Sequence, residues 1–277
     1  MGYEFVTITS RIFGFVLMMI STFDLCMGDC NSTRFEATVL SADELRFESA
    51  EKELRQLFNT RRQIPLNITD PSLFRGLDGF RHLRGRNITT KREARAFSNF
   101  LAFHFAINFH ASDKNVKSDS WRFFFEDDIS LHPNATFPMC NLLHGMLLAK
   151  NDGILYLGMC SPICILQDVF SSTNKSVAFQ KCSGTCAHAF GLTKWKAQTL
   201  LDLLQTLRFE HHTYDEQTYF DIGLFSYSKR VHPVWVIGSN LTTIQHRTVR
   251  NKKFLRYKPN HIGIFYQNRE VFPTTIG

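Results

Sequence analysis

Residues 121–128, WRFFFEDD, join a strongly apolar stretch to three consecutive acids. A short apolar run of this kind is typical of a strand that is buried on both faces of a sheet. In open α/β sheets, ligands bind beyond the carboxyl ends of the strands, so Glu126, Asp127 and Asp128 are expected at a functional edge. Because neighbouring carboxylates repel one another, the cluster favours a hard divalent cation as its ligand. The alternative is a solvated acidic turn, since Asp is common in turns.

Strands and helices alternate on both sides of this stretch. Besides the strand at 121–125, the hydrophobic pattern predicts strands at 34–40, 154–158, 186–192 and 233–238. It predicts helices at 41–58, 90–109 and 138–150 and after Thr193, with capping boxes that begin at Ser41, Thr90 and Thr213. Residues 59–86 are predicted to form a loop, and no element is predicted after Arg247. The alternation predicts an α/β sandwich with a mainly parallel sheet, built as a single domain.

The composition excludes several classes of protein. The chain has 277 residues, of which 44% are hydrophobic and 21% charged, so a disordered, collagenous, coiled-coil or multi-span membrane protein does not fit. The net charge of +7 suits a basic soluble protein or one that binds an anion such as a nucleotide diphosphate. Nucleic acid is not expected as a partner, because no dense basic run is interleaved with aromatic residues.

The N-terminus has the pattern of a secretory signal peptide. Arg11 precedes the apolar run 12–20, which is too short to span a bilayer but fits a signal-peptide core. A cut before Asp29 would remove residues 1–28, and the alternative is an uncleaved membrane anchor. Six Asn-x-Ser/Thr sequons favour a glycoprotein of the ER or Golgi lumen or a secreted one. They lie at Asn31, Asn67, Asn87, Asn134, Asn174 and Asn240.

The seven cysteines fit the same compartment. Removing Cys26 with the signal peptide leaves an even set of six: Cys30, Cys140, Cys160, Cys164, Cys182 and Cys186. In an oxidising compartment such a set favours disulfides, whose connectivity the sequence leaves open. The two pairs with CxxxC spacing, at 160–164 and 182–186, also permit a zinc-stabilised domain as an alternative.

Three further segments carry candidate functional residues. Gly184 could let the backbone approach a ligand closely, although a disulfide-tethered strand explains its segment as well. Asp215 and Glu216 are candidates for a general base, although acids are also favoured in the first turn of any helix. Near the C-terminus, His246 is a candidate metal ligand. Arg247 and Arg250 are candidates for neutralising a diphosphate, the alternative being a solvated basic surface.

Taken in order along residues 35–250, these motifs resemble glycosyltransferase family 25, which contains lipopolysaccharide glycosyltransferases and procollagen galactosyltransferases. FFFEDD is similar to the "LEDD" strand end of that family, and LYLG at 155–158 is similar to a later strand. ATVLSADELRF, with Arg46, resembles the opening strand and Arg-bearing helix. TTKREARAFSNFLAF resembles a further helix of the family, AHAFGLTKWKAQTLL resembles a strand rich in Ala and Gly with the helix after it, and Asp78-Gly79 resembles a loop.

The resemblance implies a GT-A-like, Rossmann-like α/β/α sandwich over residues 29–250, with the basic tail 251–277 packed on it. It implies transfer of a sugar, with galactose as the guess, from a UDP-sugar to a hydroxyl of a protein or glycan. Mn²⁺ or another divalent cation would be held by Glu126, Asp127, Asp128 and His246, and Asp215 or Glu216 would be the base. Gly184 would face the sugar.

A catalytically inactive relative that binds carbohydrate or protein is the alternative function. It is kept open by Arg34 and Glu36 at the first strand and by Ser98-Asn99 in place of the usual Ser-His pair of the family.

Overall fold

The computed structural model describes residues 34–65, 91–132, 135, 138–165, 170–171, 178–206, 234–238, 244–249, 252–257 and 261–268. The statements below concern these residues. The predicted signal peptide, the asparagines of all six sequons, Asp215, Glu216 and Arg250 lie outside them. Residues Arg34–Gly277 form one compact unit.

Three parallel strands form one end of the sheet. They are β1 (Phe35–Leu40), β2 (Phe58–Gln63) and β3 (Trp121–Glu126), in the order β2-β1-β3. Leu40 lies opposite Gln63 on one side and opposite Glu126 on the other. The carboxyl ends of all three strands therefore meet at one edge.

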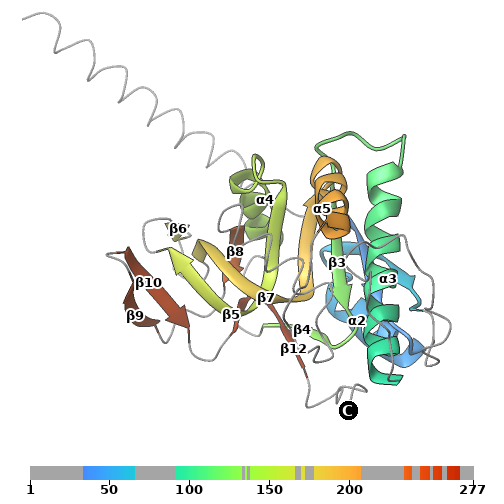
Figure 1. Ribbon diagram of the computed structural model, residues 1–277, viewed down its shortest axis with the longest axis horizontal. Coiled ribbons are helices and arrows are strands. Elements are labelled where there is room, and N and C mark those ends of the chain that lie inside the picture. The colour runs from blue at the N-terminus through green and yellow to red at the C-terminus, as the bar shows by residue number, and fades with distance from the viewer. Residues whose placement is uncertain are drawn as a thin grey trace, which may run out of the picture. The chain divides into compact units, whose positions relative to one another are not determined.

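The rest of the sheet is mostly antiparallel. The long strand β7 (Ala178–Thr193) pairs antiparallel with β3 and with β5 (Ile154–Ile165), whereas β8 (Val234–Gly238) runs parallel to β5. The chain is thus confirmed as α/β, but its sheet is mixed, with parallel pairing confined to β2-β1-β3 and β5-β8. Figure 1 shows β7 between the end that holds β3 and the end that holds β10.

The C-terminal part contributes strands to this architecture. β9 (Ile244–Val249) and β10 (Lys252–Tyr257) form an antiparallel pair at the far end of the sheet. β11 (His261–Gly263) pairs with β5, and β12 (Phe265–Gln267) pairs with β4 (Ile129–Leu131) in a separate two-stranded sheet. The short strand β6 (Phe170–Ser171) pairs with β7. The region for which the sequence predicted no element is therefore part of the fold.

Helices cover both faces of the parallel end. Neighbouring residues of a strand point to opposite faces. In β2, the Arg61 guanidinium lies 4.1 Å from the centre of the Phe109 ring in α3 (Lys91–Ser112), whereas Arg62 forms an ion pair with Glu44 in α2 (Glu44–Leu54). The helices α2 and α3 therefore lie on opposite faces of the sheet, which confirms the predicted α/β/α sandwich at this end. The other helices are α4 (Pro138–Leu148) and α5 (Lys194–Thr206), of which α5 packs against α3.

The apolar run of β3 is explained by these two layers. Phe123, Phe124 and Phe125 are all 0% exposed. The rings of Phe123 and Phe125 pack on Phe58, while Phe124 stacks on Phe190 at 5.3 Å on the other face. Each fully buried Phe contributes roughly 1.5–3 kcal/mol through the hydrophobic effect. A central strand with helices on both faces requires apolar residues at successive positions, not at alternate ones.

Two local predictions around β1 are wrong. The helix predicted at 41–58 begins later, because Asp43 and not Ser41 is its N-cap: the Asp43 side chain accepts a hydrogen bond from the Arg46 amide. Residues 58–63, predicted within the helix and the following loop, form strand β2. This strand lies at the edge of the sheet and carries polar residues after Phe58, so its sequence lacks the apolar pattern of a buried strand.

Candidate functional site

The acidic turn, defined as Glu126, Asp127 and Asp128, lies where β3 ends. The Glu126 carboxylate accepts a hydrogen bond of 2.8 Å from the Gln267 side-chain amide. Asp128 is 4% exposed, and its main-chain carbonyl accepts a 2.6 Å hydrogen bond from the Asn268 amide. The end of β12 therefore fixes two of the three acids. The position predicted for the acids, at the carboxyl end of a buried strand, is confirmed.

Asp127 is held from the other side, by the segment that follows β1. The Arg46 guanidinium forms an ion pair of 2.5 Å with Asp127 Oδ1, and the Ser41 hydroxyl lies 2.7 Å from Oδ2. The side chains of Arg46 and Asp127 are only 15% and 14% exposed, so water screens their attraction less than on an open surface. Both carboxylate oxygens of Asp127 thus have a donor from the β1–α2 segment.

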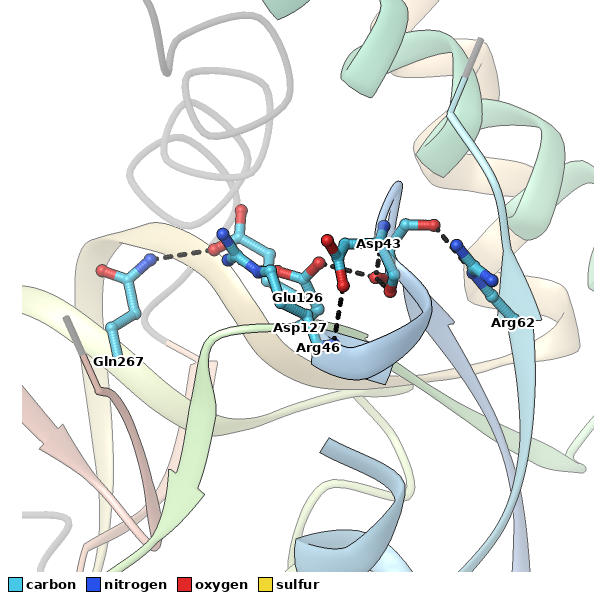
Figure 2. Close-up of polar contacts among 7 residues, drawn as sticks. Asp43, Arg46, Arg62, Glu126, Asp127 and Gln267 are labelled. Atoms are coloured by element: carbon cyan, nitrogen blue, oxygen red, sulfur yellow. Dashed lines mark hydrogen bonds and ion pairs between the residues drawn. The ribbon is translucent and has the colours of Figure 1, made fainter. Parts of the chain in front are cut away.

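The β1–α2 turn is itself tightly bonded. The Asp43 amide donates to the Ser41 hydroxyl over 3.2 Å, and Arg62 Nε donates to the Ser41 carbonyl over 3.1 Å. The Ser41 hydroxyl also lies 2.6 Å from the Asp43 carbonyl, so its single hydrogen is shared between that carbonyl and Asp127. Figure 2 shows these contacts as a row of polar side chains that runs from Gln267 to Arg62.

This row lies at the point where the strand order reverses. From β1 the chain passes through α2 to β2, and then through α3 to β3 on the opposite side of β1. The switch point of the topology is therefore between the carboxyl ends of β1 and β3. Open α/β sheets place their ligands at this point. Ser41 and Arg46 follow β1, and Asp127 follows β3, so the contacts of Asp127 join the two strand ends directly.

The remaining candidate residues are not brought to this edge by the described structure. His246 lies opposite Leu255, and Arg247 opposite Phe254, in the β9–β10 pair; their side chains lie outside the described residues. Asp215, Glu216 and Arg250 lie outside as well. Their convergence with the acidic turn stays a prediction.

Gly184 has a packing role in β7. A Cβ built on it would lie 2.5 Å from Cγ of Met159 and 2.7 Å from the Cys160 carbonyl oxygen. A side chain at this position would therefore force β5 and β7 apart. This requirement accounts for the glycine by the packing of the strands alone, and its predicted contact with a sugar stays untested.

The described acids alone do not fit a metal site. Within the described ranges, no three His, Cys, Asp or Glu side chains are grouped so that they could hold a metal ion. The acidic turn has hard oxygen donors of the right chemistry. Its Asp127 carboxylate, however, is already bonded to Arg46 and Ser41. The predicted Mn²⁺ site would need ligands from outside the described residues.

Four of the cysteines that the structure describes form disulfides. Cys164 and Cys182, which face each other across β5 and β7, are bonded to each other, and Cys140 and Cys160 are disulfide-bonded as well. The zinc alternative needed thiolates at 160, 164 and 182, so it is wrong. None of the helices in the described part of the chain is long and apolar enough to span a membrane.

Ser41 and Gln267 are the site residues that the sequence did not reveal. The sequence predicts Ser41 as a helix cap, and it predicts no element around Gln267. For Arg46, the sequence indicates only a place in a helix. The one available signal was that a polar SAD segment follows directly after the apolar end of the first strand.

No protein-family model matches the sequence, and no curated protein matches it. Among solved structures, A197 from STIV aligns with 82% of this chain and 95% of its own chain, at 8% sequence identity and a TM-score of 0.34. A likeness this weak says nothing about activity.

Proposed function

We propose that this protein is a glycosyltransferase of GT-A-like fold, which transfers a sugar from a nucleotide diphosphate donor such as a UDP-sugar to a hydroxyl group. One observation carries the proposal: Ser41 and Arg46 from the end of β1 meet Asp127 from the end of β3 at the switch point of the sheet. Nucleotides bind α/β proteins at this location. Both cationic and carboxylate groups lie there, which suits a ligand with phosphate and hydroxyl groups.

The net charge of +7 supports an anionic donor. The β1–α2 turn, bonded by Asp43 and Arg62, would hold Ser41 and Arg46 in place before the donor binds. Such preorganisation lowers the cost of ordering side chains around a ligand. During transfer, the acceptor hydroxyl would lose its proton to a carboxylate, for which the sequence offers Asp215 and Glu216.

Mn²⁺ at the acidic turn and His246 stays a prediction of the sequence. We assign no step of the reaction to it, because the described acids do not form a metal site among themselves. We further propose that the protein works in the lumen of the secretory pathway or is secreted. Its disulfides fit an oxidising compartment.

The second candidate is a secreted binding protein without activity. It is favoured by the commitment of Asp127 to Arg46 and Ser41, because such a carboxylate can serve the fold alone. The two candidates differ in turnover and agree in ligand binding.

The decisive experiment is a screen of purified full-length protein against common UDP-sugars, with Mn²⁺, with Mg²⁺ and with EDTA. Release of UDP and binding of each donor are measured separately. Glycosyl transfer or donor hydrolysis supports the enzyme if it falls at least about 100-fold in Asp127→Asn while circular dichroism shows that the variant is folded. Binding without turnover supports the inactive relative, and neither binding nor turnover for any donor contradicts both.

A further inference from the structure

The ion pair between Arg46 and Asp127 has a consequence for any metal at the acidic turn. Arg46 contacts Oδ1 of Asp127 and Ser41 contacts Oδ2, so both oxygens already accept hydrogen bonds. An arginine stays charged at every pH that a protein tolerates, so this partner cannot leave by losing a proton. A cation that approached Asp127 would have to displace the guanidinium.

The neighbouring acids offer no easy substitute for Asp127. Glu126 accepts from Gln267, and Asp128 is almost fully buried in a segment whose main chain is bonded to Asn268. A divalent cation needs several oxygens at once, since Mg²⁺ takes six ligands and Ca²⁺ six to eight. Without Asp127, the turn keeps only the carboxylates of Glu126 and Asp128, fewer oxygen donors than such a cation takes.

The ion pair between Arg46 and Asp127 lies at a largely buried position. Arg46 and Asp127 are about 85% buried at the switch point. At such depth an arginine and a carboxylate attract each other more strongly than on an exposed surface, and an unpaired carboxylate is strongly disfavoured. Arg46 lies in the first turn of α2, and its main-chain amide donates a hydrogen bond to the N-cap residue Asp43. The helix therefore places the positive charge of Arg46 at the acidic turn.

We propose that Arg46 is the resident cation of the acidic turn, and that Arg46 and a divalent metal ion are mutually exclusive partners of Asp127. Arg46 is a positioning residue in this proposal: it holds Asp127 in place and sets the affinity of the turn for metal. The proposal deepens the proposed function, because it makes donor binding at the switch point independent of a metal at Asp127.

The test measures Mn²⁺ binding directly, by the loss of the free-ion signal in electron paramagnetic resonance. The full-length wild type is compared with Arg46→Met. Groups in direct contact commonly couple by factors from about two to above one hundred. Removing the competing guanidinium is therefore expected to tighten binding of one Mn²⁺ by about tenfold or more. The double variant Arg46→Met/Asp127→Asn should return to the wild-type affinity.

Arg55→Met is the matched control. Arg55 is an exposed arginine at the C-cap of the same helix, so its loss changes the net charge equally. With a rise of 1.5 Å per residue, it lies roughly 13 Å along the helix from Arg46. Its Mn²⁺ affinity should equal that of the wild type.

Two results would overturn the proposal. One is a wild type that binds a single Mn²⁺ in the micromolar range and loses it in Asp127→Asn. The other is an unchanged Mn²⁺ affinity in a folded Arg46→Met. If Arg46→Met does not fold, Arg46→Lys replaces it: a lysine lacks the planar fork of arginine, so a smaller gain is expected, and no gain counts against the proposal.

The Mn²⁺ measurement uses neither nucleotide nor sugar, so it is separate from the donor screen. A negative screen with a positive Arg46→Met result contradicts only the proposed function. Binding of UDP in EDTA provides the second readout: it should equal binding in Mn²⁺ for the wild type. A UDP affinity that collapses in EDTA would contradict the resident-cation proposal alone.

Discussion

Replacing His110 with leucine is expected to reduce the loss of stability that the protein suffers in mild acid. His110 lies near the end of α3, is 1% exposed, and has its ring 6.5 Å from that of Phe124. Burial, followed by the positive charges of Arg122 and Lys194, lowers the pKa of His110 to about 4. The main-chain carbonyls of Leu192 and Ser120 act in the opposite direction. Leucine fills a similar volume and does not titrate.

The sign of the effect follows from proton binding. Between pH 6.5 and pH 4 the unfolded chain carries a proton on His110 and the folded protein does not. Protonation therefore favours the unfolded state as the pH falls through 6.5, and stability is lost on the acid side. A pKa difference of about 2.5 units corresponds to about 3 kcal/mol in total, of which about 2 kcal/mol is lost between pH 7.5 and pH 5.

The measurement is urea unfolding, followed by tryptophan fluorescence, at pH 7.5 and pH 5. The drop in unfolding free energy between the two pH values should be about 2 kcal/mol smaller in His110→Leu than in the wild type. His132→Leu is the control, because His132 is only half-buried although burial lowers its pKa too, and the change there should be smaller. An identical pH dependence in His110→Leu and wild type would refute this account of a buried neutral histidine.

Two further predictions concern the packing of β7. Gly191→Ala is expected to lower the unfolding free energy by about 1–3 kcal/mol, because the new Cβ would lie 2.4 Å from the buried Phe123 ring. Urea unfolding measures this change, and an unchanged unfolding midpoint would contradict the prediction. Removing the disulfide with Cys164→Ala/Cys182→Ala should cost about 3 kcal/mol, since the bond closes a loop of sequence separation 18. In the same assay, a reducing agent should destabilise the wild type by more than the double variant; equal sensitivity would show that this bond contributes little.

Much of the parallel end of the fold was predictable because its signals are local. The run of Phe123, Phe124 and Phe125 predicts a strand buried on both faces, and the structure confirms it. Thr193 was expected to cap the following helix, and its hydroxyl accepts a hydrogen bond from the Lys196 amide. The sequence did not predict strand β2, because Arg61 and Arg62 are stabilised in it by partners on α3 and α2. These partners lie too far along the chain to appear in a short stretch of sequence around the strand.

The sequence also did not predict that the sheet is mixed. Alternation of helices and strands indicates parallel pairing, but β7 runs directly between β3 and β5 in the opposite direction. Strand β7, from Ala178 to Thr193, is longer than the predicted strand. Its pairing with β5, β6 and β8 stabilises the strand conformation also where its residues are polar. Pairing partners are a property of the assembled sheet, so a strand such as β10 becomes visible only there.

The sequence by itself determined that three acids end a buried strand, because the run of apolar residues that predicts such a strand is a local pattern of consecutive residues. Only the tertiary structure decided what those acids do. Arg46 and Ser41 are separated from Asp127 by 81 and 86 positions, and Gln267 from Glu126 by 141. Such contacts form only when the order β2-β1-β3 brings the strand ends together. The acids predict a metal site from the sequence alone. In the folded protein, Asp127 is bonded to Arg46 and Ser41, and Glu126 is bonded to Gln267.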